Sequence, residues 1–195
     1  MRKTVTYLHV RAISACSTRG ILTCGSISVP CALGRSGRSF LKFEGDGASP
    51  VGIWALQQGY YRNDRFLHPR TKVPFLPLKK GCGWCETVGD RNYNRKVAIP
   101  YPSAHEELRR KDHLYDIVIA TSHNMRPRIQ GRGSAIFFHI ARPDYGATAG
   151  CIALSLHDMR KVLGFCSSKT SLVIWPPGAT PPNVFRKSPN PPAHG

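Results

Sequence analysis

The 195-residue sequence has few acidic residues, with 11 Asp and Glu against 28 Lys and Arg and a formal net charge of +17. Charged residues are 20% of the total, so the positive balance comes from the shortage of acids rather than from the high charge density of disordered chains. Hydrophobic residues make up 41%, which is enough for the core of one domain. The composition therefore excludes a mostly disordered protein.

The sequence also lacks an arginine-rich run. Basic residues are spread along the chain, and the longest cluster, residues 109–111, stands beside Glu106 and Glu107, as on the solvated face of a short helix. No motif for reading bases accompanies the charge. We expect a general attraction to anionic surroundings and no specific nucleic-acid partner.

Long hydrophobic runs are missing as well. The most apolar stretches, residues 116–120 and 135–138, are far below the roughly 18–20 residues that span a bilayer. Residues 5–15 are interrupted by His9 and Arg11 and do not form the apolar core of a signal peptide. The sequence predicts neither a transmembrane segment nor a cleavable leader.

A complete zinc motif is also absent. Cys82 and Cys85 have CxxC spacing, but no second CxxC and no HxxxH pair completes the four ligands of a structural zinc. The seven cysteines are an odd number, so at least one thiol stays unpaired in a monomer. We expect no metal and no other cofactor, and the disulfide pairing stays open.

Glycine and proline are abundant, at 18 and 16 residues, which favours short strands joined by many turns. Alternating and β-branched residues predict strands at 4–12 and 21–29, and apolar runs predict buried strands at 116–121 and 134–141. Residues 41–56 place a Gly/Asp/Pro turn between two apolar segments, as in a hairpin or a tight loop between strands. We expect a mainly β fold.

Two segments predict short helices. The first is residues 103–111, with Ser103 as N-cap, and the second is residues 156–163, with Ser155 as N-cap and Gly164 at its end. In both, an acidic residue three positions after the cap completes a capping box.

The remaining stretches define the domain organisation. Residues 57–102 are polar, aromatic and Pro-rich, and we expect a long, ordered excursion over one face of the domain. From residue 176 onward 7 of 20 residues are Pro, which indicates an extended tail. The sequence thus predicts one catalytic domain over residues 1–175 and a tail over 176–195.

Candidate chemistry concentrates at a histidine and a cysteine 12 positions apart. On a strand over residues 134–141, His139 points to the face opposite the core-facing Phe138. Cys151 follows after a turn, and its neighbour Gly150 permits close backbone approach. A hairpin-like return would bring the thiol within hydrogen-bond reach of the imidazole. Such a neighbour lowers the pKa of a thiol and supplies a proton acceptor.

The residues alone leave two interpretations of this pair. In one, Cys151 is a nucleophile, His139 is its general acid and base, and the N–H groups of Gly150 and Cys151 stabilise an oxyanion. In the other, Cys151 is a small core residue and His139 a hydrogen-bonded structural histidine. The order and spacing of the pair argue against papain-like and caspase-like thiol hydrolases.

A longer pattern surrounds the pair. His139 on its strand is followed by a variable loop and by the run Thr148-Ala-Gly-Cys-Ile. Further motifs lie at residues 31–35, 45–52, 83–85, 93–95, 122–124 and 131–137. Together they resemble the L,D-transpeptidase catalytic domain family, in its YkuD-like or ErfK-type group, over roughly residues 1–175. Many members carry Arg two positions after the cysteine, where this chain has Ala153, so no carboxylate contact is assigned there.

The resemblance favours the catalytic interpretation. It implies a β-sandwich-like domain of mixed sheets with a few short helices. It further implies that Cys151 forms a thioester with a peptidoglycan tetrapeptide stem, that His139 is general acid and base, and that an amine then resolves the thioester. Water in place of the amine would give an L,D-carboxypeptidase, and loss of turnover would leave a cell-wall-binding module.

The resemblance also implies partners and a location. Peptidoglycan stem peptides are the expected substrates, carbapenem-type β-lactams the expected inhibitors, and the periplasm or cell envelope the expected site of action. We expect His123, Thr148 and Trp84 to contribute to substrate binding. The alternatives are a histidine satisfied by local hydrogen bonds and an aromatic residue that anchors its loop.

Overall fold

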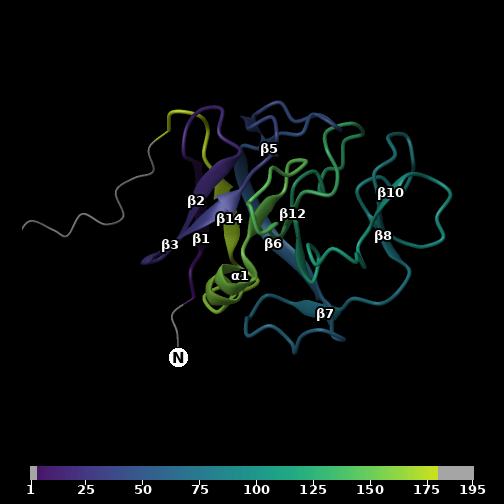
Figure 1. Cartoon of the computed structure of the whole chain (residues 1–195). Helices are drawn as coiled ribbons and strands as arrows, with labels where there is room; N and C mark the ends of the chain where they lie inside the picture. Colours follow the sequence, from purple (N-terminus) through teal and green to yellow (C-terminus); the bar gives the residue numbers. More distant parts are fainter. Residues whose placement is uncertain (1–3, 180–195) are drawn as a thin grey trace, which may run out of the picture.

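The computed structural model describes residues 4–179 and shows a mainly β protein with mixed sheets, as predicted (Figure 1). The strands are β1 Tyr7–Ala12, β2 Arg19–Cys24, β3 Ile27–Ala32, β4 Arg38–Ser39, β5 Ser49–Pro50, β6 Gly52–Tyr61, β7 Phe75–Pro77, β8 Cys82–Cys85, β9 Lys96–Ala98, β10 His105–Glu107, β11 Ile117–Thr121, β12 Phe137–Ile140, β13 Ile152–Leu154 and β14 Ser171–Ile174. The described residues contain one helix, α1 Leu156–Leu163. Within them, no helix has the length and apolar character needed to cross a membrane.

The main sheet has the order β11-β12-β13-β3-β2-β1-β14-β6-β7. Because β11 also pairs with β6, eight of these strands close into a hydrogen-bonded ring. The pairs β1–β14, β12–β13 and β6–β7 are parallel and the other pairs in this sheet are antiparallel, so the sheet is mixed. The layers expected of a sandwich are therefore joined by continuous strand pairing.

Strands β11 and β12 are buried on both faces, which explains their uninterrupted apolar sequences. On β11, Ile117 and Ile119 pack into the main core inside the ring, while Val118 and Ala120 join a second apolar cluster. The two predicted buried strands are confirmed.

Helix α1 covers the main core with the buried side chains of Met159, Val162 and Leu163. Its predicted bounds are confirmed, and the Ser155 hydroxyl accepts a hydrogen bond from the Asp158 N–H at 3.1 Å.

One predicted strand proved to be two. The stretch 21–29 contains the turn at Gly25, whose φ is +58°, and this turn separates β2 from β3. The two strands pair antiparallel up to Cys24 and Ile27. The alternating pattern continues through the turn, so the pattern alone does not reveal the reversal.

The predicted helix at 103–111 is wrong. Residues 105–107 form β10, which pairs with β8. Both expected capping groups are used elsewhere, because the Ser103 hydroxyl donates to Asp90 at 2.7 Å and the Glu106 carboxylate accepts from the Tyr115 hydroxyl. Tertiary contacts thus override the local signal.

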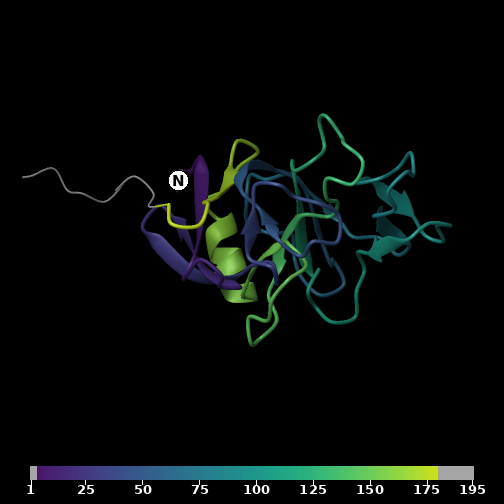
Figure 2. The same ribbon diagram turned by 90° about the horizontal axis from the view of Figure 1, so that it is seen from above.

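The excursion over residues 57–102 is ordered and carries small elements. Strand β6 continues to Tyr61, and β7, β8 and β9 follow. Strands β10, β8 and β9 form a separate sheet, which lies at the end of the molecule opposite β1–β3 in both ribbon views (Figures 1 and 2). Trp84 and Leu108 of this region pack against β11 and β12 in the second cluster, so the small sheet covers their outer face.

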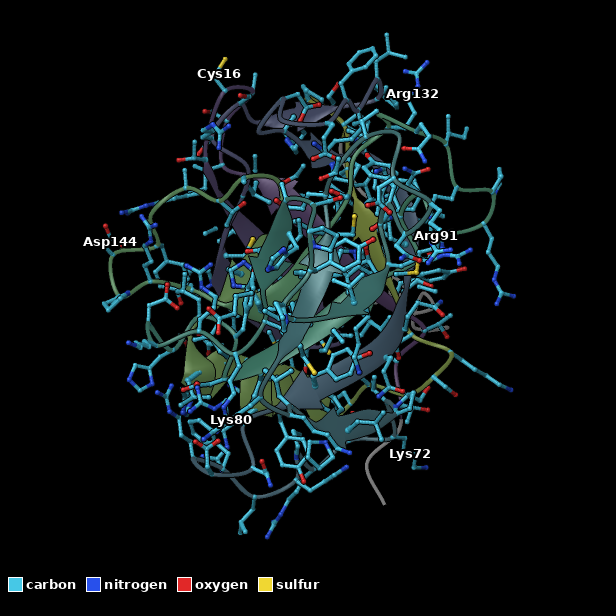
Figure 3. All side chains as sticks on the ribbon, turned by 90° about the vertical axis from the view of Figure 1, so that its right-hand side faces the viewer. Cys16, Lys72, Lys80, Arg91, Arg132 and Asp144 are labelled. Atoms are coloured by element: carbon cyan, nitrogen blue, oxygen red, sulfur yellow. The ribbon has the colours of Figure 1, made fainter. Side chains whose placement is uncertain are left out.

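The positive charge is spread over the surface. Lys72, Lys80, Arg91 and Arg132 lie at separate places around the ribbon in Figure 3. Most of the predicted tail, residues 180–195, lies outside the described residues.

We expect Phe138→Ala to lower the free energy of unfolding by about 3–5 kcal/mol, because removing a large core side chain leaves a cavity. Phe138 is fully buried in the main core. Denaturant unfolding measures the change, and Val88→Ala at an exposed position serves as control, with an expected effect within about 0.5 kcal/mol. Equal effects of the two substitutions would contradict the assigned core.

Candidate active site

Strands β12 and β13 bring His139 and Cys151 to one place. Phe138 pairs with Ile152 and His139 with Ala153, in parallel register. Cys151 directly precedes β13. The predicted hairpin is therefore wrong, because β12 and β13 run parallel and the loop over residues 141–151 crosses over instead of reversing.

The Cys151 thiol is held by backbone groups. Its Sγ donates to the Ala135 carbonyl and accepts from the Phe137 N–H, both at 3.2 Å. Ala135 adopts the left-handed conformation, with a φ of +50°, which is uncommon for a residue other than glycine. The hydrogen bonds found for this thiol within residues 4–179 go to these groups rather than to His139.

The turn before Cys151 requires glycine. Gly150 has a φ of +134°, and a Cβ at this position would lie 2.7 Å from the Ala48 carbonyl oxygen. The Thr148 hydroxyl spans the turn, accepting from the Gly150 N–H at 3.1 Å and donating to the Cys151 carbonyl at 2.7 Å. The Gly150 N–H, expected to face an oxyanion, is thus bonded to Thr148 in this structure.

A backbone carbonyl fixes the imidazole of His139. Its Nδ1 lies 2.8 Å from the Ile140 carbonyl oxygen. Because a carbonyl only accepts, Nδ1 carries the hydrogen, and Nε2 of the neutral ring is a proton acceptor. The ring also packs edge-on against Tyr115, with centroids 5.1 Å apart. The sequence alone did not identify which group orients the imidazole, and the structure places the Ile140 carbonyl there.

Burial governs the charges of the pair, since the exposed fractions are 7% for Cys151 and 5% for His139. Burial raises the pKa of the Cys151 thiol to about 12, and the Glu106 carboxylate adds to this rise. Burial lowers the pKa of His139 to about 4, against the opposing effect of the Ile140 carbonyl. The thiol and the imidazole are both neutral at pH 7, so the expected low-pKa thiol is wrong for this resting state.

A cavity of about 420 Å³ gives access to the pair. It is lined by His139, Cys151 and Thr148, by the basic residues Arg35, Lys42, Arg110 and Arg142, and by the acidic residues Glu44, Glu86 and Glu106. The site therefore combines a thiol, a proton acceptor and charges of both signs.

Trp84 and His123 lie elsewhere, and neither is among the described residues that line the cavity. Trp84 is buried edge-on against Phe137, with centroids 5.2 Å apart. His123 packs edge-on against Trp54 at 4.6 Å, and its Nε2 lies 3.0 Å from the Arg132 carbonyl oxygen. Their contacts support packing rather than the expected substrate binding.

Asn94 connects these residues to the thiol. Its Oδ1 accepts from Trp84 Nε1 at 2.9 Å and from the Ala135 N–H at 3.2 Å, and its Nδ2 donates to the His123 carbonyl at 3.1 Å. Ala135 in turn binds the Cys151 thiol. Asn94 belongs to the motif at residues 93–95, but its role could not be predicted from the sequence, because its partners are 10 to 41 positions away.

The two cysteines of the CxxC pair do not face a common binding site. Cys82 and Cys85 lie three positions apart on β8, so their side chains point to opposite faces of the strand. In the part of the chain that the structure describes, no three His, Cys, Asp or Glu residues form a metal-binding group.

The molecule is thus a mainly β domain with a cysteine and a histidine at one buried cavity beside a parallel strand pair. Residues 25–174 match the family model of the L,D-transpeptidase catalytic domain, YkuD. Because this match covers most of the chain, the protein belongs to that family, whose members act on peptidoglycan peptides of the cell envelope. No curated protein and no solved structure gives a significant match.

We expect iodoacetamide to modify Cys151 more slowly than the exposed Cys16 at pH 7.5, because the raised pKa leaves little thiolate and burial limits access. The Cys151 rate should still increase between pH 9 and pH 11. Peptide mapping identifies each cysteine, and protein unfolded in denaturant provides the reference rates. A Cys151 that reacts fastest near neutral pH would indicate a preformed ion pair instead.

The buried imidazole also predicts a pH dependence of stability. The unfolded chain takes up the His139 proton near pH 6.5, whereas the folded protein does so only near pH 4, so stability falls as the pH falls between these values. The loss should be about 3 kcal/mol larger for the wild type than for His139→Gln. Urea unfolding at pH 7 and pH 4 measures the difference, and parallel losses in both proteins would contradict it.

Proposed function

We propose that this protein is a cysteine-dependent peptidoglycan L,D-transpeptidase of the cell envelope. The observation that carries the proposal is the convergence of Cys151 and His139 on one buried cavity in a chain of this family. The Cys151 sulfur attacks the carbonyl of the third residue of a tetrapeptide stem, and the terminal D-alanine leaves. An amine then resolves the thioester, forming a 3→3 cross-link or attaching a protein.

The first half-reaction moves one proton. As the C–S bond forms and the C–N bond breaks, the thiol proton passes to His139 Nε2 and then to the departing amine. Nε2 can accept it because the Ile140 carbonyl keeps the ring hydrogen on Nδ1. Burial favours the neutral thiol and the neutral imidazole in the resting protein, so the proton moves from sulfur to Nε2 during this half-reaction.

Backbone N–H groups beside the nucleophile stabilise the tetrahedral oxyanion in this proposal. The Cys151 N–H is the main donor, and the Gly150 N–H joins only if it leaves Thr148. Thr148 acts by holding the turn. The basic residues Arg35 and Arg142 in the cavity wall suit the carboxylates of a stem peptide.

Intact-protein mass spectrometry with a tetrapeptide stem tests the proposal. We expect an acyl-enzyme and loss of D-alanine with the wild type and with the control Cys16→Ala, but no acyl-enzyme with Cys151→Ala. Acylation of His139→Ala should be about 10²–10⁴-fold slower, the usual contribution of general acid–base catalysis. A carbapenem should label Cys151 in the same assay.

Other outcomes separate the alternatives. Acylation that persists in Cys151→Ala would refute the assigned nucleophile. Acylation followed only by hydrolysis, with an amine acceptor present, would make the protein an L,D-carboxypeptidase. Binding of stem peptides without acylation would leave a cell-wall-binding module.

A further inference from the structure

Glutamates converge on the cavity. The chain has four glutamates. Glu44, Glu86 and Glu106 line the cavity, whereas Glu107 is exposed beside it. Withdrawing carboxylates from water costs free energy unless a partner compensates them. Arg35, Lys42, Arg110 and Arg142 line the same cavity, but among the described residues only Glu106 of the three forms an ion pair, with Arg110. Glu44 and Glu86 therefore leave carboxyl groups that point to a cationic ligand.

Two of these carboxyl groups form a pair. Glu86 directly follows β8, and Glu106 lies on β10, the strand paired with β8. Their side chains hydrogen-bond to each other, which requires one proton between two carboxyl groups. Glu106 also accepts from the Tyr115 hydroxyl and lies 3.5 Å from Arg110, while Glu86 has Glu106 as its side-chain hydrogen-bond partner.

The surroundings of the pair raise the pKa values of both carboxyl groups. Burial raises the pKa of Glu86 to about 7, and the carboxylates of Glu106 and Glu44 add to the rise. The charged and titratable groups that face the pair are Glu44, His105, Arg110, Asp112, Tyr115 and Cys151.

Ser134 provides an independent indication of a ligand. Its side chain lines the same cavity, the residue is 7% exposed, and its hydroxyl makes no well-formed hydrogen bond to any residue between 4 and 179. The neighbouring Tyr93 donates its own hydroxyl hydrogen to Glu44. The Tyr93 oxygen lies near enough to accept the Ser134 hydrogen, whereas no described residue donates to the Ser134 oxygen, so a ligand that donates a hydrogen bond would stabilise it.

The second half-reaction of a transpeptidase brings such a group. An acceptor amine arrives at neutral pH as an ammonium ion with three donors and one positive charge. It must lose one proton before its nitrogen can attack. His139 then moves a second proton, from the attacking nitrogen to the departing Cys151 sulfur as the C–N bond forms and the C–S bond breaks. The first proton requires another base.

We propose that Glu86 and Glu106 bind the ammonium group of the acceptor amine and take its first proton, with Ser134 as a further hydrogen-bond acceptor. This inference rests on the proposed function. When the pair has lost its shared proton, it takes one proton from the ammonium nitrogen. The free amine then attacks the thioester carbonyl, and the pair later returns the proton to water.

The test compares two nucleophiles on the same acyl-enzyme. Wild-type protein is acylated with a tetrapeptide stem and then offered either ethylamine, which is charged at neutral pH, or hydroxylamine, which is not. We expect Glu86→Gln to reduce capture by ethylamine about 10²-fold or more, while capture by hydroxylamine changes little. Raising the pH until ethylamine itself is deprotonated should restore capture. Glu107→Gln, on the same strand but exposed, should behave as the wild type.

Several results would overturn the inference. These are equal losses with both nucleophiles, unchanged capture of ethylamine, or slower acylation with an unchanged ratio of capture to hydrolysis, which would assign the ammonium to the donor stem. Glu106→Gln provides a second variant if Glu86→Gln does not fold by circular dichroism. Absence of any wild-type acyl-enzyme would refute the proposed function itself, a result distinct from failure of the glutamate pair.

Discussion

Burial of strands β11 and β12 on both faces is the constraint on which the site depends. The ring of strands covers one face and the small sheet β10-β8-β9 covers the other. His139 is carried by one of these strands and Cys151 packs in the second cluster, so both lie in a low-dielectric environment. Desolvation is the largest influence on both groups, and it favours their neutral forms. A thiol in this position can react only if its proton has an acceptor nearby.

The sequence was sufficient where structure is local. Helix Leu156–Leu163 was predicted with its cap because Ser155, Asp158 and the apolar face lie within three turns of chain. The buried strands around residues 117–121 and 137–140 were predicted from their apolar runs. Prediction failed where distant residues determine the structure. The capping groups expected at residues 103–111 bind Asp90 and Tyr115 instead. The parallel pairing of β12 with β13, whose other neighbours are β11 and β3, is likewise a long-range feature of the sheet.

The residues of the candidate site also fall into those that the sequence identifies and those that only the fold brings together. Cys151 and His139 were identified as candidates from spacing and resemblance, and the structure brings them to one cavity. Trp84 and His123 are not among the described residues that line it, and both form hydrogen bonds with Asn94, a residue whose importance depends on the fold. Glu86 and Glu106 are 20 positions apart in the sequence and meet only because β8 pairs with β10. The residues next to each glutamate in the sequence do not indicate that the two side chains meet.

The charges of the reacting groups and of the glutamate pair explain how the two half-reactions proceed in one cavity. In the proposed first half-reaction the reacting groups, a neutral thiol and a neutral imidazole, need only redistribute one proton, which suits a poorly solvated cavity. The second half-reaction brings a cation into that cavity. Because the ammonium ion loses hydrating water there, nearby carboxylates must compensate its charge. The Glu86–Glu106 pair also raises the pKa of Cys151 through its negative charge. An ammonium ion at the pair would cancel this effect and thereby improve the thiol as a leaving group when the acceptor is present. The same two carboxyl groups would thus link occupancy of the acceptor site to release of the product.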